Sequence, residues 1–383
     1  MLANDTAKLQ RLPDQAQLQA AGASWTAREI SQQPRLWQQL AEQHRGFAAQ
    51  LSSWLSPLLA QPQLRIIFTG AGTSAYIGEA LADHIQQLLP LPGQRAQAIS
   101  TTDIVSHPQL YLGSEQPTLL VSYGRSGNSP ESVAALKLAD QLLPDCRHLL
   151  ISCNAEGQLA QYAQQHPASS LLYLMPELAH DQSFAMTSSF SCMYLATLLT
   201  FAPDQQALSS CIALAQQILD SRLDEIRAQA LQPCQRMVFL GAGPLKAIAQ
   251  EAALKYLELT AGQVLSSFET PLGFRHGPKS LVNSSTQILL LQSSDSYSRQ
   301  YDLDLLHELQ QDKQALAIDV LAQQQLAAGT ALADVWLGLP FVLWCQALAF
   351  YKALQLGVSP DNPCPGGQVN RVVQGVTLYP FPE

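Results

Sequence analysis

The sequence predicts an α/β protein with two parallel β-sheets, each flanked by helices. Short apolar segments alternate with helix-like segments from residue 65 onward, which is typical of parallel sheets whose faces are covered by helices. The pattern also occurs twice, because Met237–Pro244 (MVFLGAGP) echoes Ile66–Thr73 (IIFTGAGT) and each copy runs into a helix-like stretch containing Glu-Ala. We therefore expect a duplicated unit, preceded by helices and followed by a C-terminal tail.

Local signals place each element. Residues 1–50 are expected to form an N-terminal helical segment, because Thr26–Glu29 has the form of a capping box and an apolar stripe at helical spacing follows it. The first sheet unit is expected at residues 51–205, and the second, which includes the tail, at residues 225–383. The apolar runs predicted as strands are Arg65–Thr69, Thr118–Ser122, His148–Cys153, Leu171–Met175, Met237–Leu240 and Ile288–Leu291.

Composition excludes several classes of protein. The chain has 383 residues, of which 47% are hydrophobic and 13% charged, so a packed core divided between two domains is expected. A net charge of −9 without a clustered basic stripe argues against a nucleic-acid partner. The seven cysteines lack zinc-site spacing, which indicates buried thiols in a reducing compartment. The N-terminus carries no apolar signal, and apolar runs such as 337–349 are too short to span a bilayer. We expect a soluble, cytoplasmic protein with no membrane partner.

A loop of small and hydroxyl residues follows the strand predicted at Thr118–Ser122. This loop, Gly124–Ser129 (GRSGNS), precedes a helix-like stretch that begins at Pro130. Glycines let backbone N–H groups approach an anion, hydroxyls donate further bonds, and a helix N-terminus adds a favourable dipole. An ordinary serine-rich turn has a similar composition, but Gly70–Ser74 is a second loop between a strand and a helix. Two such loops in one α/β unit can converge on one phosphate.

The corresponding loop of the second unit differs. Gln292–Ser298 (QSSDSYS) carries Asp295 in place of the Gly-x-Ser-Gly pattern. A carboxylate that faces a phosphate is unfavourable. We therefore expect only the first copy to bind an anion and the second to supply chemistry.

Three charged residues recur on one face of the helix that follows the second Gly-x-Gly turn. Glu251, Lys255 and Glu258 are spaced at i, i+4 and i+7. They are compatible with a salt-bridged, solvated helix face. The residues between them are strongly apolar, however, and functional sites tend to follow such turns. A carboxylate and an ammonium group there could move a proton beside a carbonyl group and stabilise the negative charge that develops.

His276 lies among glycine and proline residues in Gly273–Lys279 (GFRHGPK). Imidazole titrates near neutral pH and therefore suits proton transfer, although an ordinary loop histidine would look the same. The other seven histidines have no comparable context, and we assign them no role.

Two further segments leave alternatives open. Asp181–Phe190 (DQSFAMTSSF) is rich in hydroxyls and precedes a helix-like stretch, so it could line a sugar or cap that helix. The irregular segment from Ser359 to Gly375 could be a lid or simple surface packing.

Taken together, these motifs resemble the sugar isomerase (SIS) family, over roughly residues 24 to 378. The resemblance is closest to its AgaS-type branch, through the motifs TGAGTS, GRSGNSPES, FAMTSS, GFRHGPKS and VNRVVQGV. It also extends to the isomerase half of glutamine-dependent glucosamine-6-phosphate synthase. The family implies two flavodoxin-like SIS domains, and the branch is described as a galactosamine-6-phosphate deaminase/isomerase.

The resemblance also implies a role for each matching position. The phosphate would be bound by the two loops, with Arg125 beside them, and Ser188 and the tail would line the substrate. The binding positions are Gly72, Thr73, Ser74, Arg125, Ser126, Gly127, Ser129, Ser188, Arg371 and Gln374. Glu258 would transfer the proton between C1 and C2, Lys255 would stabilise the intermediate, and His276 would open the ring. In the family this histidine comes from the neighbouring subunit, so a homodimer with a shared active site is implied.

Two departures from the synthase matter. The chain lacks the glutaminase domain with its N-terminal cysteine, so it should not draw ammonia from glutamine. The synthase has a lysine in its tail, where this chain has Gln374, with Arg371 nearby. Without an ammonia source, the amino sugar reaction should run toward ammonia release. No metal or other cofactor is required, because Lys255 and the loop donors can carry the charge.

We therefore expect a galactosamine-6-phosphate deaminase with isomerase-type chemistry that acts on a phosphorylated amino sugar. A plain tagatose-6-phosphate ketose/aldose isomerase would need the same base, ring opener and phosphate loop. A non-catalytic sugar-phosphate sensor is the alternative from another class, but it would not require Lys255, Glu258 and His276 together.

Overall fold

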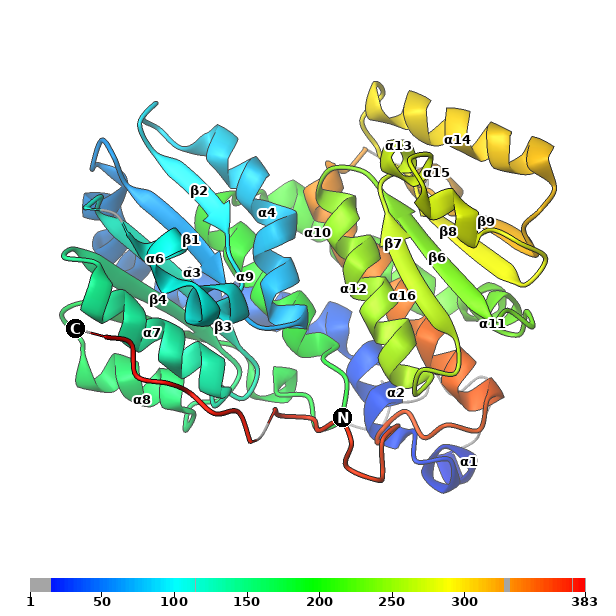
Figure 1. Ribbon diagram of the computed structural model, residues 1–383, viewed down its shortest axis with the longest axis horizontal. Coiled ribbons are helices and arrows are strands. Elements are labelled where there is room, and N and C mark those ends of the chain that lie inside the picture. The colour runs from blue at the N-terminus through cyan, green and yellow to red at the C-terminus, as the bar shows by residue number, and fades with distance from the viewer. Residues whose placement is uncertain (1–14, 114, 327–330, 374, 383) are drawn as a thin grey trace. The chain divides into compact units, whose positions relative to one another are not determined.

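The computed structural model describes residues 15–113, 115–326, 331–373 and 375–382. The chain divides into two compact units, each assembled from non-consecutive segments. The first-sheet unit comprises residues 36–181, 188–203 and 367–383. The second-sheet unit comprises residues 1–35, 182–187 and 204–366. Each unit contains one parallel sheet with helices packed on it (Figure 1).

The first sheet has five parallel strands in the order β2-β1-β3-β4-β5. They are β1 (Arg65–Thr69), β2 (Arg95–Ala98), β3 (Thr118–Gly124), β4 (Cys146–Ser152) and β5 (Ser170–Leu174). The central strand β3 is buried along its whole length, as its unbroken apolar run predicts. The chain passes from β1 to β2 on one side and then to β3 on the other. The carboxyl ends of β1 and β3 therefore flank the point where ligands bind in open α/β sheets.

Helices cover both faces of the first sheet. They are α3 (Gln33–Leu59), α4 (Thr73–Leu88), α5 (Thr101–Ser106), α6 (Pro108–Leu112), α7 (Pro130–Leu142), α8 (Gln158–Gln165) and α9 (Ser188–Phe201), with a 3₁₀ turn, η1, at Glu177–Ala179. On one face, Leu120 and Leu150 from the strands pack with Leu136 of α7 and Leu159 of α8 in one apolar cluster. This packing holds α7 against the sheet, next to the loop that connects it to β3.

The second sheet repeats the first four strands, in the order β7-β6-β8-β9. Its strands are β6 (Arg236–Gly241), β7 (Leu265–Glu269), β8 (Thr286–Leu291) and β9 (Ala317–Leu321). The helical elements of this unit are α1 (Gln15–Ala20), α2 (Ser24–Ser31), α10 (Gln205–Ser221), α11 (Leu223–Ala230), α12 (Pro244–Leu259), α13 (Pro271–Phe274), η2 (Pro278–Leu281), α14 (Ser298–Asp312), α15 (Gln323–Leu326) and α16 (Asp334–Gln355). Helix α12 packs on β6, β7 and α16 (Figure 1).

Helix α16 is the core helix of the second-sheet unit. The sequence predicts an apolar run at 337–349 that is too short to span a bilayer. The whole helix, Asp334–Gln355, is longer, and its length and apolar composition would allow it to cross a membrane. Of its apolar window, 94% is buried in the protein, where it packs against α2, α10, α11 and α12. The apolar surface of α16 is thus accounted for by packing within the unit.

The duplicated parallel-sheet architecture predicted from the sequence is confirmed, and all six predicted strands are present. Three strands, β2, β7 and β9, were not predicted because they are short, partly exposed edge strands without a continuous apolar run. The capping-box prediction was wrong. Helix α2 begins at Ser24, and Thr26 and Glu29 instead bond to residues distant in sequence. The compact units also interleave in sequence, whereas the expected boundaries were consecutive.

Candidate active site

The two predicted phosphate loops lie at adjacent strand ends. Strands β1 and β3 pair in parallel up to Thr69 and Ser122, so their carboxyl ends reach the same edge of the sheet. The loop Gly70–Gly72 leaves β1 there, and the loop Arg125–Ser129 leaves β3. Each leads directly into a helix, α4 or α7. The topology therefore brings both loops to the switch point of the first sheet, as the sequence predicts.

Backbone N–H groups are available in both loops. Gly72 and Gly127 have positive φ values of 55° and 64°, a backbone conformation that favours glycine. The N–H groups of Thr73, Ser126 and Gly127 make no hydrogen bond with any described residue. Thr73 is the first residue of α4, so its N–H lies at the positive end of the helix dipole. Donors of this kind are what a phosphate group requires.

The serine side chains of the second loop differ in how strongly they are engaged. Ser129 is the N-cap of α7 and accepts a hydrogen bond from the Ser132 N–H at 3.3 Å. The Ser126 hydroxyl accepts a bond from the Asn128 N–H at 3.2 Å, while Asn154 Nδ2 donates to the Ser126 carbonyl at 2.9 Å. Asn154 thereby holds the backbone of the loop, and the Ser126 hydroxyl proton is left able to donate to a ligand.

Two arginines and a histidine gather beside this loop within the first-sheet unit. The buried Arg125 guanidinium donates to the carbonyl of Arg371 at 2.5 Å, and the Arg371 guanidinium donates to the carbonyl of Asp181. Burial lowers the pKa of His180, and the Arg371 and Arg125 charges lower it further. The structure thus brings Arg371 to the phosphate loop, in a positive environment that suits an anion. Gln374 lies outside the described residues.

Ser188 is buried at the start of α9 and donates to Asp181 Oδ1 at 2.6 Å. Its N–H also bonds to Asp181, as do the N–H and hydroxyl of Ser189. These bonds are a helix-capping arrangement, and the lining of a sugar by this segment stays a prediction. The sequence signal was Asp followed by hydroxyl residues before an apolar helix.

The charged face of α12 is largely buried, with Glu258 at its exposed end. The side chains of Glu251 and Lys255 are 0% and 1% exposed, while that of Glu258 is 24% exposed. Lys255 Nζ forms an ion pair with Glu258 and lies 3.7 Å from Glu251 Oε1. Burial raises the pKa of the Cys345 thiol of α16, and the Glu251 charge raises it further. The lysine is therefore held between two carboxylates, of which only Glu258 reaches solvent.

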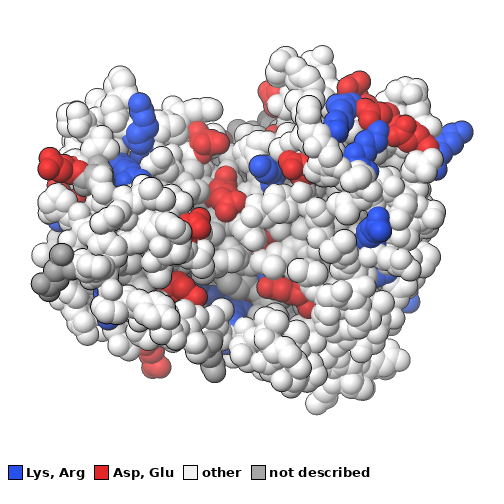
Figure 2. All heavy atoms as spheres, in the orientation of Figure 1, with Lys and Arg blue, Asp and Glu red and all other residues white. Residues whose placement is uncertain are grey.

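His276 is exposed in the turn between α13 and η2. Its side chain makes no hydrogen bond or ion pair with any described residue. The next residue, Gly277, has a φ of +123°, and the flanking Arg275 and Lys279 are ion-paired to α14. Figure 2 shows the basic and acidic atoms side by side over α13 and α14. The turn is thus anchored on both sides, while the imidazole has no bonded partner in the described part of the chain.

In the second repeat, the loop that corresponds to the phosphate loop already binds a carboxylate of the chain itself. The sequence predicts that Asp295 faces this loop, but its carboxylate instead accepts the N–H groups of Tyr297 and Ser298 at the start of α14. The carboxylate that contacts the loop serines is Asp334, the first residue of α16. Sequence reasoning missed Asp334, because it lies 40 residues from Ser294.

No group of three or more His, Cys, Asp or Glu side chains among the described residues is arranged to hold a metal ion. The seven cysteines are free, and six of them are buried.

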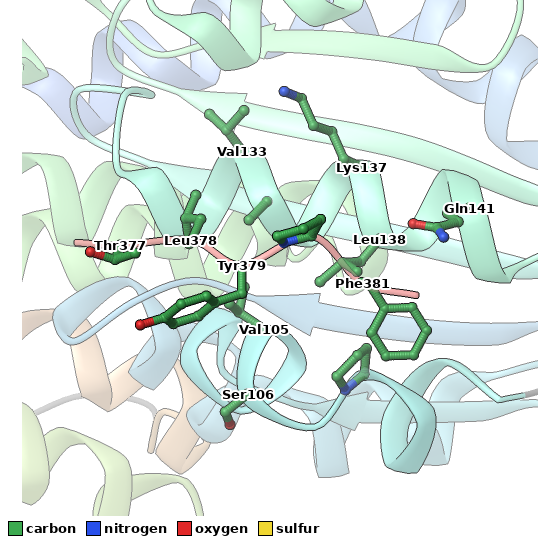
Figure 3. A pocket seen from close by; sticks show the side chains of 13 residues that line it. Val105, Ser106, Val133, Lys137, Leu138, Gln141, Thr377, Leu378, Tyr379 and Phe381 are labelled. Atoms are coloured by element: carbon green, nitrogen blue, oxygen red, sulfur yellow. The ribbon is translucent and has the colours of Figure 1, made fainter. Parts of the chain in front are cut away.

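A groove of about 970 Å³ lies elsewhere in the first-sheet unit, between α5, α7 and the tail residues 377–381 (Figure 3). Apolar side chains such as Val105, Leu138 and Phe381 line it, together with Lys137 and Gln141. None of the candidate site residues lines this groove, so it is distinct from the loops described above.

Comparison with known proteins decides the family. The SIS domain model matches residues 58–203. A relative from Shewanella sp. (strain ANA-3), named D-galactosamine-6-phosphate deaminase AgaS, is 65% identical over 95% of this chain and 94% of its own length. The chain belongs to the SIS family. Within it, the chain is similar to the AgaS proteins, as the sequence motifs indicate.

Two further relatives extend the comparison. The crystal structure of tagatose-6-phosphate ketose/aldose isomerase from Escherichia coli is 39% identical, covers 93% of this chain and 96% of that one, and superimposes with a TM-score of 0.86. The glutamine–fructose-6-phosphate aminotransferase of Caulobacter vibrioides is 25% identical over 78% of this chain, which matches 50% of that protein. The predicted relation to the isomerase half of the synthase is therefore confirmed as a distant one.

Proposed function

We propose that this protein is a D-galactosamine-6-phosphate deaminase that converts its substrate to tagatose 6-phosphate and ammonia. The observation that carries the proposal is the 65% identity, over nearly the full length of both chains, to a relative of that name. The ion pair between buried Lys255 and partly exposed Glu258 on α12 supports it, because deamination by this route needs a base and a cation beside one carbon centre.

The phosphate group is assigned to the loops of the first-sheet unit. The Ser74, Ser126 and Ser129 side chains would donate hydroxyl bonds, and the backbone N–H groups of Gly72, Thr73 and Gly127 would complete the cradle. Arg125, with Arg371 bonded to it through the tail backbone, would supply positive charge. This arrangement is supported by the N–H groups that have no acceptor among the described residues.

The chemical steps are assigned to the second-sheet unit. Opening of the sugar ring exposes the C1 aldehyde, which acidifies the C2 proton. Glu258 removes that proton as Lys255 stabilises the negative charge developing on the C1 oxygen, and a proton then returns to C1. The result is an imine at C2 and a hydroxymethyl group at C1. Water adds to the imine carbon, and the C–N bond breaks to leave the ketose phosphate and ammonia.

His276 is proposed as the group that opens the ring, acting in the site of a second copy in a homodimer. Its exposed imidazole, without an intramolecular partner among the described residues, supports this assignment. Mixing inactive His276→Ala with inactive Glu258→Gln protein should restore some turnover, because mixed dimers would contain one intact site. Exchange of subunits without any recovery of turnover would exclude a shared site.

A second candidate is an isomerase that interconverts tagatose 6-phosphate and its aldose without amine loss. The E. coli structure that is 39% identical bears that name. The purified protein should therefore be incubated with galactosamine 6-phosphate, glucosamine 6-phosphate and N-acetylgalactosamine 6-phosphate, and ammonia measured. Ammonia from the first substrate supports the deaminase, whereas aldose–ketose conversion with no ammonia from any substrate would support the isomerase.

The role of Glu258 has its own test. Glu258→Gln preserves size and hydrogen bonding but removes basicity, so kcat should fall by about 10²–10⁴-fold. The same variant should stop exchange of the C2 hydrogen with heavy water, which needs the base but not amine loss. Exchange at the wild-type rate would place the base elsewhere, and Glu251 would be the next candidate. A reducing cytoplasm is the proposed location, in keeping with the seven free cysteines.

A further inference from the structure

The two repeats can be aligned by strand register, without reference to loop sequence. In the first sheet Thr69 of β1 pairs with Ser122 of β3, and in the second Leu240 of β6 pairs with Leu290 of β8. Thr69 and Leu240 each precede the Gly-Ala-Gly turn of their repeat. Ser126 follows Ser122 of β3 by the same number of residues as Ser294 follows Leu290 of β8. Ser294 of the second repeat therefore corresponds to Ser126 of the first.

Ser294 and its neighbour Ser293 bind the carboxylate of Asp334. Asp334 Oδ1 accepts the Ser294 N–H at 2.7 Å and the Ser294 hydroxyl at 2.9 Å. Asp334 Oδ2 accepts the Ser293 hydroxyl at 2.5 Å. One backbone N–H and two hydroxyls thus converge on a single anionic group, which is the donor set expected of a phosphate loop after a parallel strand.

The residue that supplies this carboxylate begins the final helix of the repeat. Asp334 is the first residue of α16, and the first residue of α9, the final helix of the first repeat, is Ser188. A neutral hydroxyl in the first repeat is therefore replaced by an acid in the second. Asp302 of α14 faces the same loop, where it accepts the Ser293 N–H at 2.8 Å. The loop of the second repeat is surrounded by negative charge from within the chain.

We propose that the second repeat retains an anion-binding loop and that the Asp334 carboxylate is its resident ligand. The chemical class that this loop accepts is a compact oxyanion such as phosphate or a carboxylate. Asp334 excludes such anions from solution, so each chain binds a single phosphate, in the first repeat. This inference concerns binding alone and does not depend on which reaction the protein catalyses.

The test is to remove the Asp334 carboxylate from the loop by substitution and to measure the binding of inorganic phosphate. Asp334→Ala removes the carboxylate, and Asp334→Ser introduces the hydroxyl that α9 has at its start. Calorimetric titration with phosphate at constant ionic strength should give one site per chain for the wild type and two for these variants. Phosphate should also raise the melting temperature of the variants at least twice as much as that of the wild type, relative to chloride.

Two matched controls isolate the role of the carboxylate. Asp334→Asn keeps the size of the side chain, leaves the loop filled and should show one site. Asp295→Ala removes an acid that contacts the start of α14 rather than the loop donors, and should also show one site.

A folded Asp334→Ala variant with one site and a wild-type phosphate response would overturn the proposal. If neither Asp334→Ala nor Asp334→Ser folds in chloride, both variants should be refolded in phosphate. Recovery specific to phosphate would support the proposal, and failure in both salts would overturn it.

Discussion

Glu308 of α14 connects the two ends of the turn that carries His276, and its removal should impair turnover without weakening substrate binding. Glu308 Oε2 lies 2.7 Å from Arg275 Nε, and Glu308 Oε1 is ion-paired with Lys279 Nζ. Hydrogen bonds from Lys279 and then Arg275 hold the pKa of Glu308 below its usual value, so the carboxylate stays charged at neutral pH. If His276 opens the ring as proposed, Glu308 is a positioning residue for that step.

The expected magnitude follows from the exposure of these groups. The Glu308, Arg275 and Lys279 side chains are 34%, 24% and 28% exposed, so each ion pair should contribute no more than about 0.2–1 kcal/mol. Loss of both pairs in Glu308→Ala would lower the ratio of ordered to disordered turn by roughly 2- to 30-fold, since about 1.4 kcal/mol corresponds to tenfold. We expect kcat to fall by at most about that factor while KM changes little, because the phosphate-binding loops are untouched.

Steady-state kinetics of Glu308→Ala, Glu308→Gln and Asp304→Asn would test this. Asp304 is 72% exposed, and among the described residues its carboxylate pairs only with Arg275, so its variant should lose less than about twofold in kcat. If Glu308→Ala has the wild-type kcat while His276→Ala has a reduced kcat, the positioning role of Glu308 is refuted. Wild-type kcat in His276→Ala would instead refute the proposed role of the histidine.

Three further predictions concern stability and binding. Asp361→Ala should lower the free energy of unfolding by about 2–4 kcal/mol in urea titrations, because its carboxylate accepts the Thr26 N–H and hydroxyl, both at 2.8 Å, near the start of α2. Burial raises the pKa of Asp302 to about 6, so the folded protein binds a proton more tightly than the unfolded chain, and this group's contribution to stability falls as pH rises from about 4 to 6. Asp302→Asn should therefore gain stability relative to wild type across that window, and a constant difference from pH 4 to 7 would contradict the shifted pKa. Ser126→Ala should raise both KM and the inhibition constant of phosphate, whereas Ser294→Ala should leave phosphate inhibition unchanged; equal effects would mean that the repeats are wrongly assigned.

The parts of the fold that the sequence predicted are those encoded by local patterns. Buried strands such as β3 are continuous apolar runs, and the two Gly-Ala-Gly turns identify the repeat. Edge strands are specified by pairing with a neighbour more than by their own residues, so β2, with the sequence RAQA, carries no such signal. The helical spacing on α12 correctly placed Lys255 and Glu258 on one face. The near-complete burial of Lys255 could not be predicted, because it depends on which other elements pack against α12.

Contacts between distant segments account for the rest. Asp334 reaches Ser294 across 40 residues, and Arg371 reaches Arg125 across 246. No local pattern encodes either contact. Position in the family motif drew attention to Arg371, whereas Asp334 has no motif and is recognised only from the hydrogen bonds that it makes.

The interleaved second-sheet unit has a consequence for how the chain matures on the ribosome. The segment Ser359–Asp361 bonds to Gly22 and Thr26, across 335 to 339 residues. At a synthesis rate of about 5–20 residues per second, the N-terminal partners must wait roughly 15–70 s for the segment that completes them. The first sheet, whose strands all lie between residues 65 and 174, can pair during that interval. Nascent chains should thus pass through a stage in which the first sheet is formed while α2 still lacks Asp361, and premature termination before that residue would leave α2 without this partner.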